Sequence, residues 1–245
     1  MAKRKVVRKK VVRKNIAKVF ENQTPKEWGE TVSGVKTKFD TNEKVIALTM
    51  DACGSPLGMG YDEELINFLK QEKVPATLFI NARWIDKNLN TFKTLASNPL
   101  FEIANHGLEH KPASVNGKSI YGLDGSKNME ELIDEIELNA RKIEQITNKR
   151  PKYFRSGTAY YDEVAVKIAN KLNHQVIGFS ILGDGGATFS KEKVENAFLK
   201  AKNGEIAIIH MNHPHSQTAD GTIKAIKELK QKGFKFVRLS DYKLK

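Results

Sequence analysis

Two histidines, His106 and His110, stand four residues apart in the segment NHGLEH. Imidazoles at this spacing can reach one metal ion, from a helical turn or from a compact loop. The pair follows a short apolar segment, residues 101–104 (FEIA), that is typical of a buried strand. Because parallel α/β proteins build their sites at the carboxyl ends of strands, this position favours a metal site over a chance pair on the surface.

Three more residues with useful chemistry, Asp51, Arg155 and His210, also lie at or just past the end of an apolar segment. Asp51 could take a proton from a water molecule, and His210 could protonate a leaving amine or alcohol. Arg155 could orient Asp51 through a bidentate ion pair. Each residue also has a purely structural alternative. Asp51 could be a turn residue, Arg155 could form a surface ion pair, and His210 could be a buried, hydrogen-bonded core residue. With His106, these residues place four polar side chains at the ends of four predicted strands. We expect the four side chains to lie together in one site.

The elements that must position these residues alternate along the chain. Apolar segments predict strands over residues 44–50, 76–80, 101–104, 153–155, 175–180, 205–210 and 234–239. Helical spacing predicts helices over residues 63–71, 91–97, 128–147, 162–172, 191–202 and 221–231. The clearest helix, residues 128–147, has an expected apolar face of Leu132, Ile133, Ile136, Leu138, Ile143 and Ile146. This alternation predicts a parallel α/β fold, either doubly wound or a barrel.

The formal net charge of +12 is concentrated at the start of the chain. Residues 1–14 hold eight Lys or Arg and no acid, which leaves +4 for the remainder. Such an arm would attract an anionic polymer or a membrane surface, and no specific nucleic-acid partner is predicted. The alternative is a disordered, solvated tail. No apolar run follows the arm, so no signal peptide is visible. We predict a basic arm and polar connector over residues 1–42, and a single domain over residues 43–245.

Length and composition exclude several other classes of protein. The 245 residues are 40% hydrophobic, which is enough for one large core or at most two small domains. No segment approaches the roughly 20 consecutive apolar residues that a membrane helix needs. The single cysteine, Cys53, rules out an intrachain disulfide.

The order of the chemical segments resembles the polysaccharide deacetylase family, the NodB-like carbohydrate esterase family 4. The segments are LTMDACG, HGLEH, RSGT, GDGG and IIH, and the neighbouring VPATLFINARWI is also similar. The resemblance extends over about residues 44–239. It implies a distorted (β/α) barrel of the NodB-homology type.

The resemblance also implies a role for each matching residue. Asp51 is implied as the base and His210 as the acid, with Arg155 orienting the base and Asp184 in its surroundings. His106 and His110 are implied as ligands of a divalent metal ion, for which imidazoles favour Zn²⁺, with Co²⁺ or Ni²⁺ as alternatives. The resemblance also implies that Ile208 contacts the acetyl methyl, and the implied mechanism uses a backbone amide near Thr158. Tyr160 could stack on a sugar ring; the alternative is an aromatic residue that only packs beside the start of a helix.

The function implied is a metal-dependent hydrolase that removes acetyl groups from a polysaccharide containing N-acetylglucosamine, such as peptidoglycan or a chitin-like glycan. Acetyl esters are also possible substrates. Such substrates imply an extracytoplasmic or cell-wall location. One departure supports an alternative, a catalytically weak or inactive glycan-binding member. Ala52 stands where the family has a metal-ligand aspartate. Cys53 could be a small buried filler or a replacement ligand.

Overall fold

The computed structural model describes residues 13–245, which cluster into two compact units. Unit 1 comprises residues 13–35 and Asn105–Ile177. Unit 2 comprises Lys36–Ala104 and Gly178–Lys245. The boundary predicted between residues 42 and 43 stays a prediction.

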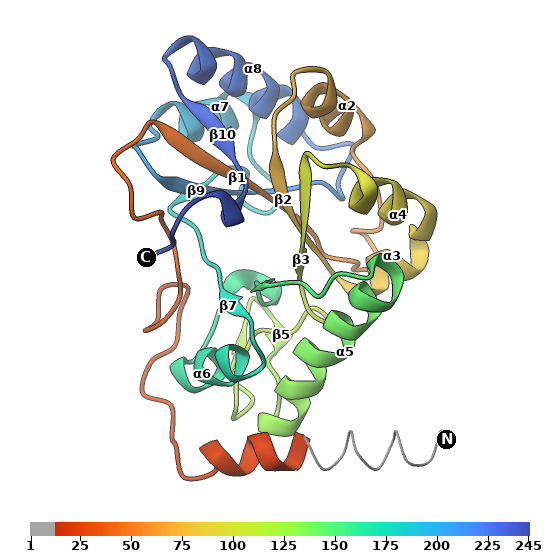
Figure 1. The fold of residues 1–245 in the computed structure, drawn as a ribbon, viewed down its shortest axis with the longest axis vertical. Helices are drawn as coiled ribbons and strands as arrows, with labels where there is room; N and C mark the ends of the chain where they lie inside the picture. Colours follow the sequence, from red (N-terminus) through yellow and green to blue (C-terminus); the bar gives the residue numbers. More distant parts are fainter. Residues whose placement is uncertain (1–12) are drawn as a thin grey trace. The chain divides into compact units, whose positions relative to one another are not determined.

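Unit 2 is built on a parallel sheet whose strands follow the order β3-β2-β1-β9-β8, with β10 paired to β1 (Figure 1). The strands are β1 (Val45–Ala52), β2 (Ala76–Ile80), β3 (Phe101–Asn105), β8 (Ile181–Leu182), β9 (Glu205–His210) and β10 (Lys235–Val237). The helices are α2 (Glu63–Gln71), α3 (Ala82–Lys87), α4 (Leu89–Ser97), α7 (Lys191–Leu199), α8 (Thr218–Gln231) and the 3₁₀ turn η2 (Leu239–Asp241). Helices α7 and α8 pack against each other.

Strand β1 lies at the centre of this sheet and is buried at every position. It pairs with β9 over most of its length, with β10 at its start and with β2 at its end. A strand covered on both faces needs a continuous apolar run, which the sequence VIALTM supplies. Helix α2 begins where Asp62 accepts a hydrogen bond from the backbone N–H of Leu65, and it buries Leu65, Ile66 and Leu69.

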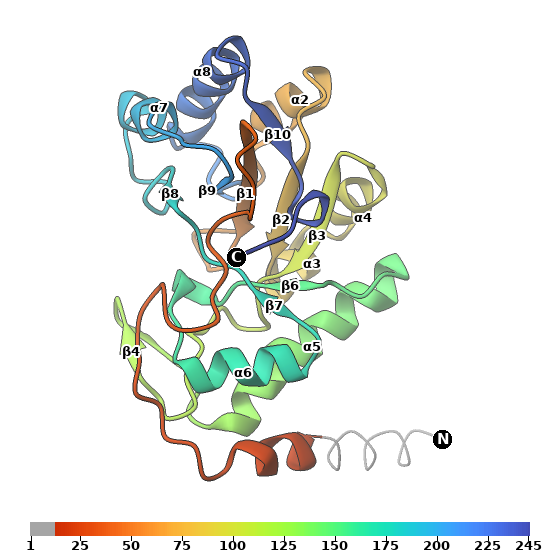
Figure 2. The same cartoon turned by 60° about the vertical axis from the view of Figure 1, so that its left-hand side comes forward.

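Unit 1 is centred on two helices, α5 (Met129–Thr147) and α6 (Glu163–Lys171), which pack together (Figure 2). Its other elements are the hairpin β4 (Ser119–Ile120) and β5 (Leu123–Asp124), the strands β6 (Tyr153–Phe154) and β7 (Gln175–Val176), and the 3₁₀ turn η1 (Gly157–Ala159). Helix α5 begins at the capping side chain of Asn128 and ends at Asn148, which has a left-handed conformation. The last residue of β3, Asn105, pairs with Phe154 of β6.

Several sequence predictions are wrong in detail. The helix predicted over residues 191–202 ends at Leu199, and Leu239, predicted in the last strand, lies in η2. Leu138 was expected on the apolar face of α5, but 39% of its surface is exposed. It follows Leu132 by six residues, and 100° per residue carries it to the other side of the helix. The strand predicted over residues 175–180 ends at Val176. Beyond it, the N–H of Gly178 bonds to the carbonyl of Lys36, and a separate strand, β8, follows.

Residues 1–12 of the predicted basic arm lie outside the described part of the chain. Residues 13–20 are helical, and Arg13 forms ion pairs with Glu130 and Asp134 of α5. The part of the predicted connector that belongs to unit 1 packs against the rest of that unit: Phe20 is buried, and the carboxylate of Glu163 accepts the backbone N–H groups of residues 26 and 27. Over residues 13–245, no helix is long and apolar enough to cross a membrane.

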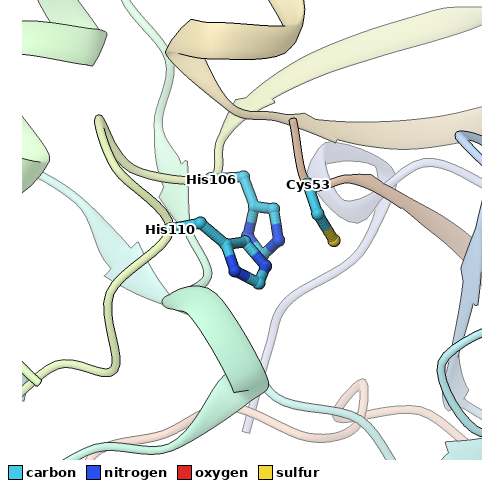
Figure 3. Close-up of side chains that lie close together, drawn as sticks. All are labelled: Cys53, His106 and His110. Atoms are coloured by element: carbon cyan, nitrogen blue, oxygen red, sulfur yellow. The ribbon is translucent and has the colours of Figure 1, made fainter. Parts of the chain in front are cut away.

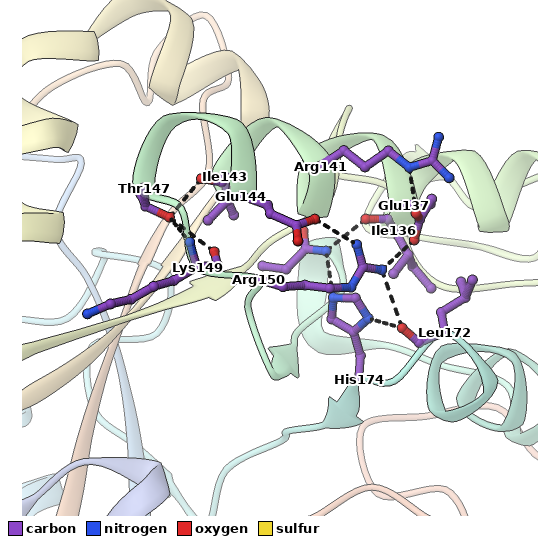
Figure 4. Close-up of polar contacts among 11 residues, drawn as sticks. Ile136, Glu137, Arg141, Ile143, Glu144, Thr147, Lys149, Arg150, Leu172 and His174 are labelled. Atoms are coloured by element: carbon purple, nitrogen blue, oxygen red, sulfur yellow. Dashed lines mark hydrogen bonds and ion pairs between the residues drawn. The ribbon is translucent and has the colours of Figure 1, made fainter. Parts of the chain in front are cut away.

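His174 is buried beside the end of α5, under the ion pairs of Arg150 with Glu137 and Glu144 (Figure 4). Its Nδ1 lies 3.0 Å from the carbonyl oxygen of Leu172, so the proton is on Nδ1. Burial, and then the positive charge of Arg150, lowers the pKa of His174 to about 4. The ring is therefore neutral in the folded protein.

We predict that His174 makes unit 1 acid-sensitive. The unfolded chain binds this proton near pH 6.5 and the folded chain near pH 4, so stability falls as the pH drops through this window. The loss approaches about 3 kcal/mol at the acid end. Urea unfolding between pH 7 and pH 4 measures it. The variant His174→Gln should lose less stability over that window, and an unchanged pH dependence would contradict the assignment.

Candidate active site

His106 and His110 lie close together on the loop that follows β3. Their ring centroids are 4.7 Å apart and the planes are nearly perpendicular (Figure 3). Nδ1 of His106 is 2.9 Å from the carbonyl oxygen of Arg155. A carbonyl only accepts hydrogen bonds, so Nδ1 carries the proton and Nε2 keeps its lone pair. The sequence prediction of a histidine pair suited to binding a metal ion fits this geometry.

Asn105 holds the start of the histidine loop. Its side-chain oxygen accepts the N–H of Gly107 at 2.9 Å and the side-chain amide of Asn139 at 2.8 Å. Its own amide nitrogen donates to the carbonyl of Ile136 in α5 at 2.8 Å. Because Asn105 is completely buried, these bonds are strong constraints on the position of the next residue, His106.

Glu135 of α5 holds the second half of the loop. Its carboxylate accepts the N–H groups of Glu109 at 2.9 Å and Lys111 at 3.1 Å, on either side of His110. Burial raises the pKa of Glu135, although these bonds act against the rise. Gly107 has a φ of +78°, and a Cβ there would approach the Glu135 carboxylate to 2.4 Å. The sequence analysis missed Glu135; its signal was an acid beside the apolar face of α5.

Three more predicted residues lie in unit 1. Arg155 is fully buried, with its Nε donating to the carbonyl of Ile177 at 3.2 Å. Thr158, in η1, has a φ of +68°, and the preceding Gly157 packs against the carbonyl of His110. Tyr160 follows η1 and is partly exposed. The ion pair of Arg155 with Asp51 stays a prediction.

Asp51 and His210 lie opposite each other in unit 2, at the carboxyl ends of β1 and β9. Asp51 is 2% exposed, and its carbonyl accepts the N–H of Met211 at 3.0 Å. Ile208 lies opposite Thr49, two residues earlier on each strand, and is 5% exposed. The structure therefore brings the predicted base and acid to the same end of one strand pair.

Asp184, which follows β8, binds His210 through two contacts. Its Oδ1 lies 2.9 Å from Nδ1 of the ring, and its Oδ2 accepts the backbone N–H at 2.7 Å. Burial alone would lower the pKa of His210, but the charge of Asp184 and hydrogen bonds with Asp184 and Cys53 raise it well above the ordinary value. Thr218 also donates to the Asp184 carboxylate, at 3.0 Å. The imidazole is thus protonated and held in one orientation.

We predict that Asp184→Asn lowers the pKa of His210, because the amide keeps a hydrogen-bond acceptor but loses the charge that raises the pKa. The ring should then lose its proton at a lower pH than in the wild type. An NMR titration of the His210 ring measures this shift. Asp220→Asn, an exposed acid on α8, is the control and should leave the titration unchanged. Equal titrations for Asp184→Asn and wild type would refute the role of Asp184.

A family profile described as polysaccharide deacetylase matches residues 38–177, more than half of the chain. The peptidoglycan-N-acetylglucosamine deacetylase of Bacillus cereus is 27% identical over an alignment of 216 residues that covers 86% of this chain and 94% of that protein.

Two solved structures show the same fold. One is a peptidoglycan N-acetylglucosamine deacetylase, with a TM-score of 0.72 and 22% identity over 86% of this chain and 92% of that one. The other is a CE4 family pseudoenzyme from Bacillus anthracis, with a TM-score of 0.67 and 24% identity over 82% of this chain and 66% of that one. The predicted fold class, a distorted (β/α) barrel, is confirmed.

Proposed function

Because the chain belongs to the polysaccharide deacetylase family, we propose that it hydrolyses the acetamido groups of N-acetylglucosamine in a peptidoglycan-like or chitin-like glycan. The name of the Bacillus cereus relative, a peptidoglycan-N-acetylglucosamine deacetylase, supports an N-acetyl substrate. The products are acetate and a glycan with free amines. A peptidoglycan substrate also favours the extracytoplasmic or cell-wall location expected from the sequence.

We propose that His106 and His110 are metal ligands and that Cys53 supplies the ligand that Ala52 cannot. Figure 3 draws the three side chains, which offer two imidazole nitrogens and one thiol sulfur as ligand atoms. This donor set suits Zn²⁺, although Co²⁺ and Ni²⁺ also accept imidazole ligands. When bound, such an ion polarises the acetyl carbonyl and lowers the pKa of a bound water.

The chain's own residues would move the protons of the reaction. Asp51 accepts a proton from the water that attacks the acetyl carbon, and Arg155 orients its carboxylate. His210 donates the proton from its Nε2 to the departing amine nitrogen. A backbone N–H near Thr158 donates to the acetyl oxygen as negative charge develops there. Ile208 contacts the acetyl methyl.

The pairing of His210 with Asp184 is the observation that carries this proposal. A buried carboxylate keeps the imidazole protonated at the strand end that also holds Asp51. A general acid needs this proton at neutral pH. A protein that only binds glycan has no need of a protonated histidine and a carboxylate at neighbouring strand ends.

The test is acetate release from acetylated glucosamine oligomers and peptidoglycan, with and without added Zn²⁺. We predict that Asp51→Asn and His210→Ala each lower the rate at least about 100-fold, because each removes one proton-transfer group. The control His215→Ala, an exposed histidine, should keep the wild-type rate. Wild-type turnover in both site variants would overturn the assignment.

The alternative is a glycan-binding member with little or no activity. Ala52 favours it, and so does the structural likeness to a CE4 family pseudoenzyme. This reading predicts that the wild type binds oligomers but releases no acetate at any Zn²⁺ concentration.

The third ligand can be tested separately by calorimetry. We predict that Cys53→Ala weakens Zn²⁺ binding at least about tenfold, because two imidazoles alone leave the tetrahedral set incomplete. Adding Ala52→Asp to this variant should recover affinity, because a carboxylate replaces the thiol. The fully buried Ala52 makes misfolding a possible cause of failure, so melting temperatures must accompany each titration. Unchanged affinity in Cys53→Ala would exclude the thiol.

A further inference from the structure

Three aromatic rings from distant parts of unit 1 gather on its surface: Trp28, Tyr121 and Tyr160, here called the aromatic platform. The Tyr160 ring centroid lies 5.8 Å from that of Trp28 and 5.7 Å from that of Tyr121. Nζ of Lys118 lies 5.8 Å from the centre of the Trp28 ring. The predicted sugar-stacking residue, Tyr160, is thus the middle of a larger surface.

The backbone holds this platform in place. Gly29 and Tyr161, which follow Trp28 and Tyr160, exchange two backbone hydrogen bonds of 3.1 and 2.9 Å. Tyr160 also accepts the N–H of Ala113 through its carbonyl, at 3.0 Å. Rings fixed by their own backbone lose little freedom when a ligand binds, which favours recognition.

Packing does not explain Tyr121. It lies in the two-residue turn between β4 and β5, where its φ is +53° and that of Gly122 is +74°. Such turns favour Asn or Gly, because a side chain at positive φ is strained. The ring is 71% exposed, so it buries little surface in return. A strained, exposed aromatic residue in contact with another ring points to a ligand.

The chain segment that leads to Tyr160 contacts the histidine loop through its backbone. The N–H of Gly157, three residues before Tyr160, donates to the carbonyl of Lys111 at 3.1 Å. Gly157 also packs so closely on the His110 carbonyl that a Cβ would approach that oxygen to 2.0 Å. A polymer held at the histidine pair could therefore extend over the platform.

We propose that the aromatic platform binds a sugar ring of the glycan at a position away from the acetyl group that is cleaved. This inference rests on the proposed function. A pyranose ring has an apolar face that stacks on aromatic side chains, while the Tyr hydroxyls and Lys118 can bond to its oxygens. The carboxyl of Glu30, which acts electrostatically on Tyr160, offsets the charge of Lys118, so these two groups give no net positive charge that would favour an anionic membrane surface.

Tryptophan fluorescence tests the proposal independently of catalysis. The chain has two tryptophans, and Trp84 is completely buried, so Trp28 reports on the platform. An N-acetylglucosamine pentamer should change the emission of the wild type, and Trp28→Phe should remove that response. Tyr121→Ala should weaken pentamer binding about tenfold, whereas Tyr121→Phe should stay within about twofold because the stacking ring remains.

Activity and control variants separate the two proposals. With the pentamer, Tyr121→Ala should raise KM and keep kcat; with a dimer, both should be unchanged. Leu138→Ala, an exposed apolar residue of unit 1 outside the platform, should match the wild type throughout.

Equal pentamer affinity in Tyr121→Ala and wild type, or no pentamer binding by the wild type, overturns the proposed sugar-binding role of the platform. Platform-dependent binding to phosphatidylglycerol vesicles but not to pentamer would also overturn it. Pentamer binding without acetate release overturns the proposed catalysis alone.

Discussion

The burial of β1 on both faces is the constraint on which unit 2 depends. All eight residues of this strand are buried, and three neighbouring strands bond to it. Its backbone groups must therefore be paired in one register, because an unpaired buried peptide group is costly. That register sets Asp51 opposite His210. As a consequence, Asp51 and His210, which end the two apolar runs, lie at the same edge of the sheet.

The histidines of unit 1 lie on a loop, so no regular ladder of backbone hydrogen bonds fixes their positions. Buried polar side chains replace the ladder: Asn105 binds Gly107, and Glu135 binds the N–H groups on either side of His110. A buried carboxylate is costly unless it is bonded in this way. The bonds that stabilise Glu135 in unit 1 are thus the same bonds that shape the loop.

The charges of unit 2 show how one carboxylate can determine the chemistry of its neighbour. Asp184 is fully buried, and its charge and hydrogen bonds outweigh the effect of burial on His210. The same interaction lowers the pKa of Asp184, although burial alone would raise it. Each group therefore stabilises the charged form of the other. Ala52, by contrast, contributes no charge at the end of β1.

The sequence by itself determined the parallel α/β fold. Continuous apolar runs as short as β1 and β9 indicate buried strands, and they alternate with segments of helical spacing. The sequence also located Asp51, His106 and His210 at strand ends. It could not determine partners whose contact depends on folding. Asp184 and His210 are 26 residues apart, as are Glu135 and Glu109. Trp28 and Tyr160 are farther apart still. Local patterns record which face of an element is buried, but pairings across such gaps arise only when packing brings the segments together.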